Sequence, residues 1–269
     1  MMMMIGCTCA GMSYAAEHGQ QQQFDGFNLE GYKNNGQKAW VVNGDQADIH
    51  GSQINISNVD AETYGDEKVN LTAKTGVIDQ TSGNIHLEKD VVITSESGAQ
   101  LTTDSLDWHR SEDLVKTEEG VVITDKGMTA TGTGMDAHPG LKTAQIHEDV
   151  TVTMQTQPDQ AQPGTVTITC DGPMSIDQAK SMAVFQDNVV AVQEDQTLTA
   201  DRMEIYFDEE KKQIKEMICI GHVVIVRGEN KTVAERAVYN GSDRKLVLTG
   251  RPKLILVTEG NNAFTSVGD

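Results

Sequence analysis

Histidines, cysteines and a repeated set of carboxylates are the side chains of this sequence that could carry chemistry. The seven histidines show no metal-ligand spacing with one another or with a cysteine, so we expect them at the surface or in loops rather than on a metal ion. Cys170 and Cys219 form either one disulfide, if the compartment is oxidising, or two small buried thiols. The sequence therefore predicts no metal site.

Acidic residues recur at comparable places along the chain, at Asp48, Asp104, Asp201 and Glu235. A catalytic pair needs two carboxyl groups within about 10 Å of each other. Repetition near every proposed bend instead predicts a structural task, such as accepting backbone N–H groups at a corner. The sequence has no G-x-S-x-G element, Walker loop or dinucleotide fingerprint. We predict no catalytic residue, no cofactor and no enzyme activity.

The charge and composition of the chain exclude further classes of function. The 269 residues carry 21 Lys and Arg against 40 Asp and Glu, a formal net charge of −19, and 4% are aromatic. A nucleic-acid partner is excluded, because a phosphate backbone is bound by Lys and Arg. No run of about 18 apolar residues predicts an ordinary membrane-spanning helix.

The first residues have a composition of their own. Residues 1–23 are apolar and small and then glutamine-rich, which predicts a leader followed by a polar linker. Small residues before Ala16 resemble a signal-peptide cleavage site, although no basic residue precedes Lys33. Met4 to Cys7 also resembles a lipoprotein box, which would place lipid on Cys7. A disordered terminus is the third alternative.

The rest of the chain has the pattern of an all-β protein. Short runs rich in Val, Ile and Thr alternate apolar and polar residues, and turn residues separate them about every ten residues. A motif of apolar, any, small and polar residues recurs from Asp45 to Thr232 with a period near 30, typical of stacked supersecondary units. The polar segment 155–164 interrupts this period, which predicts a linker between two modules, 24–154 and 165–269.

The inward parity changes within several repeats. Leu198 and Ala200 share one face, whereas Met203 and Ile205 continue on the other parity. A shift of one residue indicates a β-bulge or corner, which allows one strand to serve two facing sheets. We therefore predict a repeating two-sheet β-jellyroll, elongated, with open edge strands at both ends.

The second module repeats a small residue before an acidic one, at Ala200-Asp201 and Ala234-Glu235. Aromatic residues follow them, Tyr206 and Tyr239, and a Gly-His-Val begins at Gly221. In these residues the module resembles the OstA/LptA-type repeat, and the resemblance covers residues 165–257. Residues 24–154 are similar to LptC-type proteins, on the segments Ala39 to Val42, Gly44, Ala47-Asp48 and Ile54 to Ile56.

This resemblance implies a periplasmic component of lipopolysaccharide export, in some cases associated with the inner membrane. Its implied fold is a V-shaped (β-taco) jellyroll with lipid A acyl chains in the groove. The implied partners are lipopolysaccharide, other jellyroll subunits that pair edge to edge, and an inner-membrane ABC transporter. An apolar interior with few aromatic residues suits alkyl chains, since each buried methylene contributes about 0.8 kcal/mol. The net charge predicts that the anionic head is not captured electrostatically.

Groove residues follow from parity and repeat offset. An offset of 30 residues relates Val91 and Ile93 to Val121 and Ile123. The predicted lipid-binding positions are Ile85, Leu87, Val91, Ile93, Val121, Ile123, Val150, Val152, Val189, Ala191, Val223, Ile225, Leu254 and Leu256. A packed core without a ligand gives the same pattern. Two other functions remain open, an extracellular β-solenoid enzyme acting on polysaccharide and a ligand-free structural or adhesive β-array.

Overall fold

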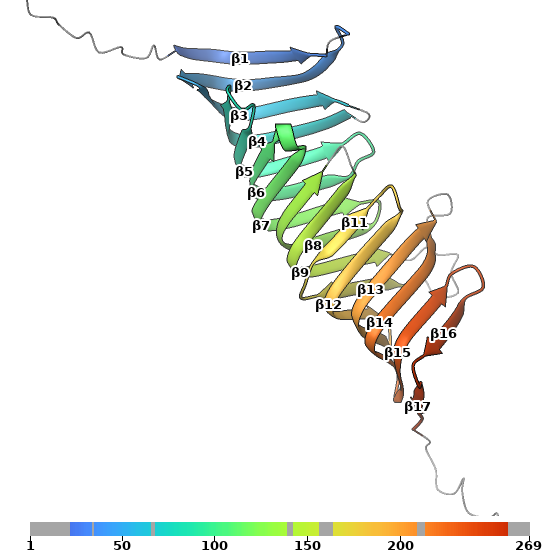
Figure 1. Ribbon diagram of the computed structural model, residues 1–269. Coiled ribbons are helices and arrows are strands. Elements are labelled where there is room, and N and C mark those ends of the chain that lie inside the picture. The colour runs from blue at the N-terminus through green and yellow to red at the C-terminus, as the bar shows by residue number, and fades with distance from the viewer. Residues whose placement is uncertain are drawn as a thin grey trace, which may run out of the picture.

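In the computed structural model, antiparallel strands stack one below another from the N-terminal to the C-terminal end (Figure 1). The structure describes residues 22–33, 35–65, 68–138, 142–155, 164–208 and 213–257. Most of the predicted leader, with Cys7, and most of the predicted linker 155–164 lie outside these ranges. No helix in the described part of the chain is long and apolar enough to span a membrane. The all-β jellyroll class predicted from the sequence is confirmed.

The described strands form one sheet, in which most strands pair with their neighbours in the sequence, except that β10 and β11 both pair with β9 and β12, and β16 and β17 both pair with β15. One turn of 3₁₀ helix, η1 (Arg110–Glu112), follows the sixth strand. The strands are β1 (Gln22–Tyr32), β2 (Lys38–His50), β3 (Gln53–Tyr64), β4 (Lys68–Asp79), β5 (Ile85–Ser95), β6 (Gln100–His109), β7 (Leu114–Asp125), β8 (Met128–His138), β9 (Thr143–Gln155), β10 (Thr165–Cys170), β11 (Met174–Asp177), β12 (Met182–Gln193), β13 (Gln196–Asp208), β14 (Gln213–Arg227), β15 (Asn230–Asn240), β16 (Lys245–Thr249) and β17 (Lys253–Ile255).

The sheet continues across the predicted linker. Strand β9 pairs with β10 from Gln155–Thr165 to Val150–Cys170 and with β11 further along. Both short strands also pair with β12. Residues Asp171 to Pro173 separate β10 from β11, so the pair occupies the place of one bent strand. The two stretches of the sequence are therefore hydrogen-bonded to each other directly.

Strands β5, β12 and β14 bend in the middle, where a pair of residues adopts left-handed backbone conformations. Lys89 and Asp90 in β5 have φ of 66° and 54°, and Asp187 and Asn188 in β12 have 62° and 52°. Two residues lie there opposite one, because Glu88 pairs with Ser105 and Val91 with Thr103. Such a bulge bends a strand without ending it. The runs Ile85–Leu87 and Val91–Ile93 are consequently two arms of β5.

The predicted corner carboxylates divide into two groups. Asp104, Asp201 and Glu235 lie at shifts of strand register, as expected. Asp48 does not, because it pairs in regular register with Asn55 and Gln23. Asp201 pairs with a side chain rather than a backbone N–H, since its Oδ2 lies 2.8 Å from His222 Nδ1.

In five strands, β5, β7, β9, β12 and β14, the bend is followed directly by a buried valine. Val91, Val121, Val150, Val189 and Val223 are at most 1% exposed. They pack in two core clusters, one in β2–β7 and a larger one in β7–β15. Cys170 and Cys219 are free and buried within the second cluster, so the disulfide alternative is wrong.

Two inward rows of apolar residues cross the sheet, one on each arm. The first row runs through paired positions Leu29, Val42, Ala61, Leu71, Ile93, Leu101, Ile123, Ala130, Val152, Ile168, Ala191, Leu198, Ile225, Thr232 and Leu254. The second row runs through Ile49, Ile54, Ile78, Ile85, Trp108, Val115, Ala137, Ala144, Ile176, Ala183, Ile205, Met217, Tyr239 and Leu246. Only Thr232 interrupts their apolar character.

The glycine at the β14 bend gives a stability prediction. Gly221 has φ of 77°, and a Cβ there would overlap the Asp201 carboxylate. Gly228 also has positive φ, 56°, but open space around it. We expect Gly228→Ala to cost about 1–2 kcal/mol from backbone strain alone, and Gly221→Ala about 1 kcal/mol more. Urea unfolding followed by circular dichroism measures both, and equal midpoints would contradict the packing role of Gly221.

Candidate functional site

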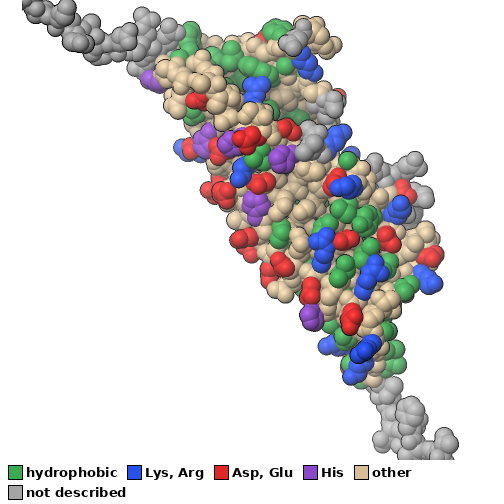
Figure 2. All heavy atoms as spheres, in the orientation of Figure 1, with side chains coloured by type: hydrophobic (Ala, Val, Ile, Leu, Met, Phe, Trp, Pro, Cys, Tyr) green, Lys and Arg blue, Asp and Glu red, His purple; other side chains and the backbone are tan. Residues whose placement is uncertain are grey.

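A pocket of about 350 Å³ opens between the two inward rows in the first six strands. The first row contributes Leu29, Val42, Ala61 and Leu71, and the second row contributes Ile54, Ile78, Ile85 and Trp108. Figure 2 shows hydrophobic side chains gathered near this N-terminal end of the molecule. The volume lies at the lower end of the range for small-molecule sites, about 300–1,000 Å³.

The floor of the pocket includes one position without a side chain, Gly76. Gly76 lies between Ile56 and Leu87 in the strand register. A Cβ at Gly76 would lie 2.9 Å from Val59 Cγ2 and 3.1 Å from Leu87 Cδ2, so a side chain there would compete with the wall for space. The glycine therefore lets the Val59 and Leu87 side chains close over this position.

The corresponding floor positions are bulky in the second half of the chain. Met174, Phe185 and Met203 succeed one another in register there and are each at most 2% exposed. These side chains fill the space between the arms. The sequence pattern does not distinguish an open groove from a packed core, and the filling of the interior differs between the two halves of the chain. The pocket lies in the first half, whereas the second half contains a well-filled core.

The mouth of the pocket holds two tryptophans and an arginine. The Arg110 guanidinium carbon lies 5.6 Å from the centroid of the Trp40 ring and 5.8 Å from that of Trp108, within the range of cation–π attraction. Arg110 begins the η1 turn directly after β6. Gly31, paired with Trp40 in the sheet, leaves room for the indole, because a Cβ at that position would overlap it.

The two carboxylates that line the pocket have partners. Glu62 accepts a hydrogen bond from Tyr64 and pairs with Lys68 at 3.0 Å, and both contacts hold the pKa of this carboxyl below its usual value. Asp79 accepts hydrogen bonds from the backbone N–H groups of Thr81 and Ser82, each at 2.8 Å. By contrast, the Trp108 indole Nε1 is buried without a hydrogen-bond acceptor.

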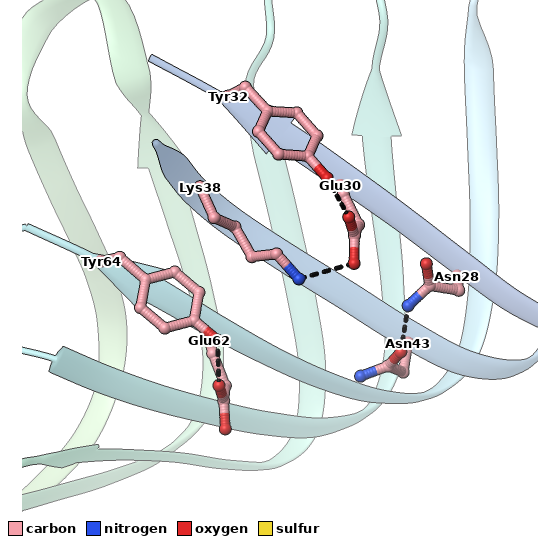
Figure 3. A network of polar contacts seen from close by, with 7 residues as sticks. All are labelled: Asn28, Glu30, Tyr32, Lys38, Asn43, Glu62 and Tyr64. Carbon is pink, nitrogen blue, oxygen red and sulfur yellow. Dashed lines mark hydrogen bonds and ion pairs between the residues drawn. The ribbon is translucent and has the colours of Figure 1, made fainter. Parts of the chain in front are cut away.

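A polar network on β1–β3 ties the edge strand to its neighbours (Figure 3). Lys38 lies 2.6 Å from the Glu30 carboxylate, which also accepts a hydrogen bond from Tyr32. The contact with Lys38 lowers the pKa of Glu30, and the same contact raises the pKa of Lys38. Asn28 donates to Asn43 across the β1–β2 pair. These contacts fix the strand that supplies Leu29 to the pocket.

Histidines pair with carboxylates on the outer surface instead of meeting in the groove. His86 lies between Glu88 and Asp107, which raise its pKa, and His147 and His222 face Asp136 and Asp201. Acidic and histidine side chains accordingly follow one side of the molecule (Figure 2). Among the described residues, no three His, Cys, Asp or Glu side chains come together as metal ligands would.

The predicted groove residues lie in four environments. Ile85 and Leu87 line the pocket. The five valines Val91, Val121, Val150, Val189 and Val223 are buried at the bends, and Ile93, Ile123, Val152, Ala191 and Ile225 lie in the first inward row. Leu254 ends that row at the last strand, 62% exposed, and Leu256 follows it, 60% exposed.

Parity alone missed the pocket's mouth. Trp40, Trp108 and Arg110 come from different strands and a turn, and their convergence depends on the stacking of β2 against β6 through the bends. The available signal was composition, because the chain has only two tryptophans and both line the pocket.

Comparison with known proteins places two family models along the chain. The model described as lipopolysaccharide-assembly, LptC-related, matches residues 13–155, and the model of LptA and LptD N-terminal lipopolysaccharide transport proteins matches residues 167–267. This is the order inferred from the repeat motifs. No curated protein matches the chain.

Proposed function

We propose that this member of the LptC-related family of lipopolysaccharide-assembly proteins holds the acyl chains of lipopolysaccharide between its two inward rows. An LptA-like region follows the LptC-related region in the same chain. Its family gives it a role in lipopolysaccharide transport. The observation that carries the proposal is the apolar pocket between Leu71 and Ile85, at which the two arms of the sheet stand apart. The proposed location is the periplasm, where such a protein links the two membranes.

The apolar rows supply the chemistry that the acyl chains need. Transfer of a methylene from water to an apolar surface contributes about 0.8 kcal/mol, so even a few methylenes in the pocket provide measurable affinity. The first row reaches from Leu29 on β1 to Leu254 on β17. An interior lined by apolar residues along the whole sheet favours binding of acyl chains over binding of polar head groups.

Partners of the same fold are proposed at the two ends. Within the described part of the chain, β1 pairs only with β2, and β16 and β17 pair only with β15. Leu246, Val247 and Ile255 are 41–44% exposed at the C-terminal end. Unpaired strand edges beside exposed apolar side chains favour addition of another strand. These ends are the proposed contacts with other jellyroll subunits and, at the inner membrane, with an ABC transporter.

Two adjacent positions on β4 test the groove assignment. Leu71 lines the pocket, whereas the exposed Thr72 points to the opposite face of the same strand. With a photoreactive amino acid at each position in turn, we expect lipopolysaccharide to be labelled from position 71 and not from position 72. Mass spectrometry of the irradiated, folded protein measures the adducts. Equal labelling at the two positions, or none at 71, would remove the proposal.

A further inference from the structure

We propose that Arg110 selects amphiphiles with an anionic head, by pairing with a phosphate whose alkyl chain enters the pocket between the inward rows. The inference rests on the proposed function, because it assigns a head-group contact to the same site. It names a specificity-determining residue within a chain whose net charge of −19 would otherwise repel anions.

The position of Arg110 suits this task. Its side chain is exposed at the mouth of the pocket, and its guanidinium lies against the rings of Trp40 and Trp108. A guanidinium on an aromatic face keeps the N–H donors around its edge available, and their fork matches the oxygens of a phosphate. The two indoles therefore hold the cation in place without neutralising it.

The charge of Arg110 is unmatched within the described residues. Some other cations of the chain have carboxylate partners, for example Lys38 with Glu30, Lys68 with Glu62 and Arg202 with Glu204. No carboxylate lies within ion-pair distance of Arg110 in the described part of the chain, and Asp79 and Glu62 at the pocket are engaged elsewhere. An unpaired cation thus stands at the rim of an apolar pocket, which is the arrangement that an anionic amphiphile complements.

A second donor lies beside the cation. Trp108 Nε1 is buried and has no acceptor, although buried polar groups nearly always have one. Trp108 lines the pocket, and its ring contacts Arg110. An oxygen near the junction of head and chain would satisfy this N–H. The Trp108 indole and the Arg110 guanidinium then both bind the polar end of the ligand, while the two inward rows contact its alkyl chain.

Tryptophan fluorescence measures binding at this site alone, because Trp40 and Trp108 are the only tryptophans of the chain. We would titrate the full chain with dodecyl phosphate and with dodecanol, both below micelle formation, for the wild type, Arg110→Gln and Arg236→Gln. Arg236 is an exposed arginine on β15, far from the pocket in the sheet order, and serves as the matched control.

We expect Arg110→Gln to weaken dodecyl phosphate binding about tenfold and to leave dodecanol binding within about twofold, since charged hydrogen bonds contribute to the first ligand alone. Arg236→Gln should change neither. Added salt should weaken only the phosphate ligand. If wild type and Arg110→Gln bind dodecyl phosphate equally, the role of Arg110 is wrong while the groove proposal stands. If the wild type binds neither probe, both proposals fail.

Discussion

Replacement of Ala61 by phenylalanine is expected to abolish uptake of acyl chains by the first half of the chain. Ala61 belongs to the first inward row and lines the pocket, between Val42 and Leu71. A benzyl group added there projects toward Ile54 and Ile78 on the facing row, where the acyl chain would lie. The pocket is already near the lower limit for a ligand site, so one ring removes most of its usable volume.

The measurement is binding of radiolabelled lipopolysaccharide to the purified variant, for which we expect a loss of at least about tenfold in affinity, or about 1.4 kcal/mol. Val122→Phe is the matched control, because Val122 is a 40% exposed residue of β7 that does not line the pocket. It should bind as the wild type does. Undiminished binding by Ala61→Phe would show that the chains lie elsewhere.

Truncation of Phe185 is expected to give the largest loss of stability. Phe185 is 2% exposed and is the largest of the fully buried side chains. It lies between Met174 and Met203 at the filled floor of the second half. Phenylalanine-to-alanine changes in a core remove the transfer energy of the ring and leave a cavity, at a cost of about 3–5 kcal/mol.

Urea unfolding of Phe185→Ala, followed by circular dichroism, tests this value through the midpoint. Val192→Ala on the same strand is the control, because Val192 is 40% exposed, and its cost should stay within about 0.5 kcal/mol. Tryptophan fluorescence reports the first half separately, since both tryptophans lie there. A loss below about 1 kcal/mol for Phe185→Ala would show that the second core is loosely packed.

The fold was predictable because its signals are local and repeated. Alternation of Val, Ile and Thr indicates strands, and the change of parity between Ala200 and Met203 indicates a bend. The left-handed pairs at these bends are mostly Asp, Asn, Gly and His, the residues that tolerate this conformation, and a valine follows each. Lys89 is the exception.

The candidate site was less predictable, because it depends on volumes and on distant contacts. Leu87 and Met203 occupy comparable inward positions, yet Leu87 borders an open pocket and Met203 a filled core. Strand parity does not distinguish the two positions, because it assigns a residue to a face of the sheet and does not give the volume around it. Ile85 and Leu87 were found by parity. Arg110 was not, because it follows a strand and reaches the mouth only through the η1 turn.

Net charge and local charge give opposite expectations for the site. The total of −19 predicts no electrostatic capture of an anionic head. The screening length in physiological salt is about 8 Å, so carboxylates further away contribute little at the pocket mouth. The proposal for Arg110 therefore depends on the unpaired cation between its two indoles and not on the total charge.

The direct pairing of β9 with β10 and β11 has a consequence for assembly. The regions that match two separate family models are made in equal numbers from one message, and neither can dissociate from the other into bulk solvent. Their junction closes at an effective concentration set by the short connecting segment, typically millimolar, whatever the amount of protein in the cell. Dilution, competition from homologous subunits and unequal expression, which weaken a bimolecular contact, therefore leave this one intact.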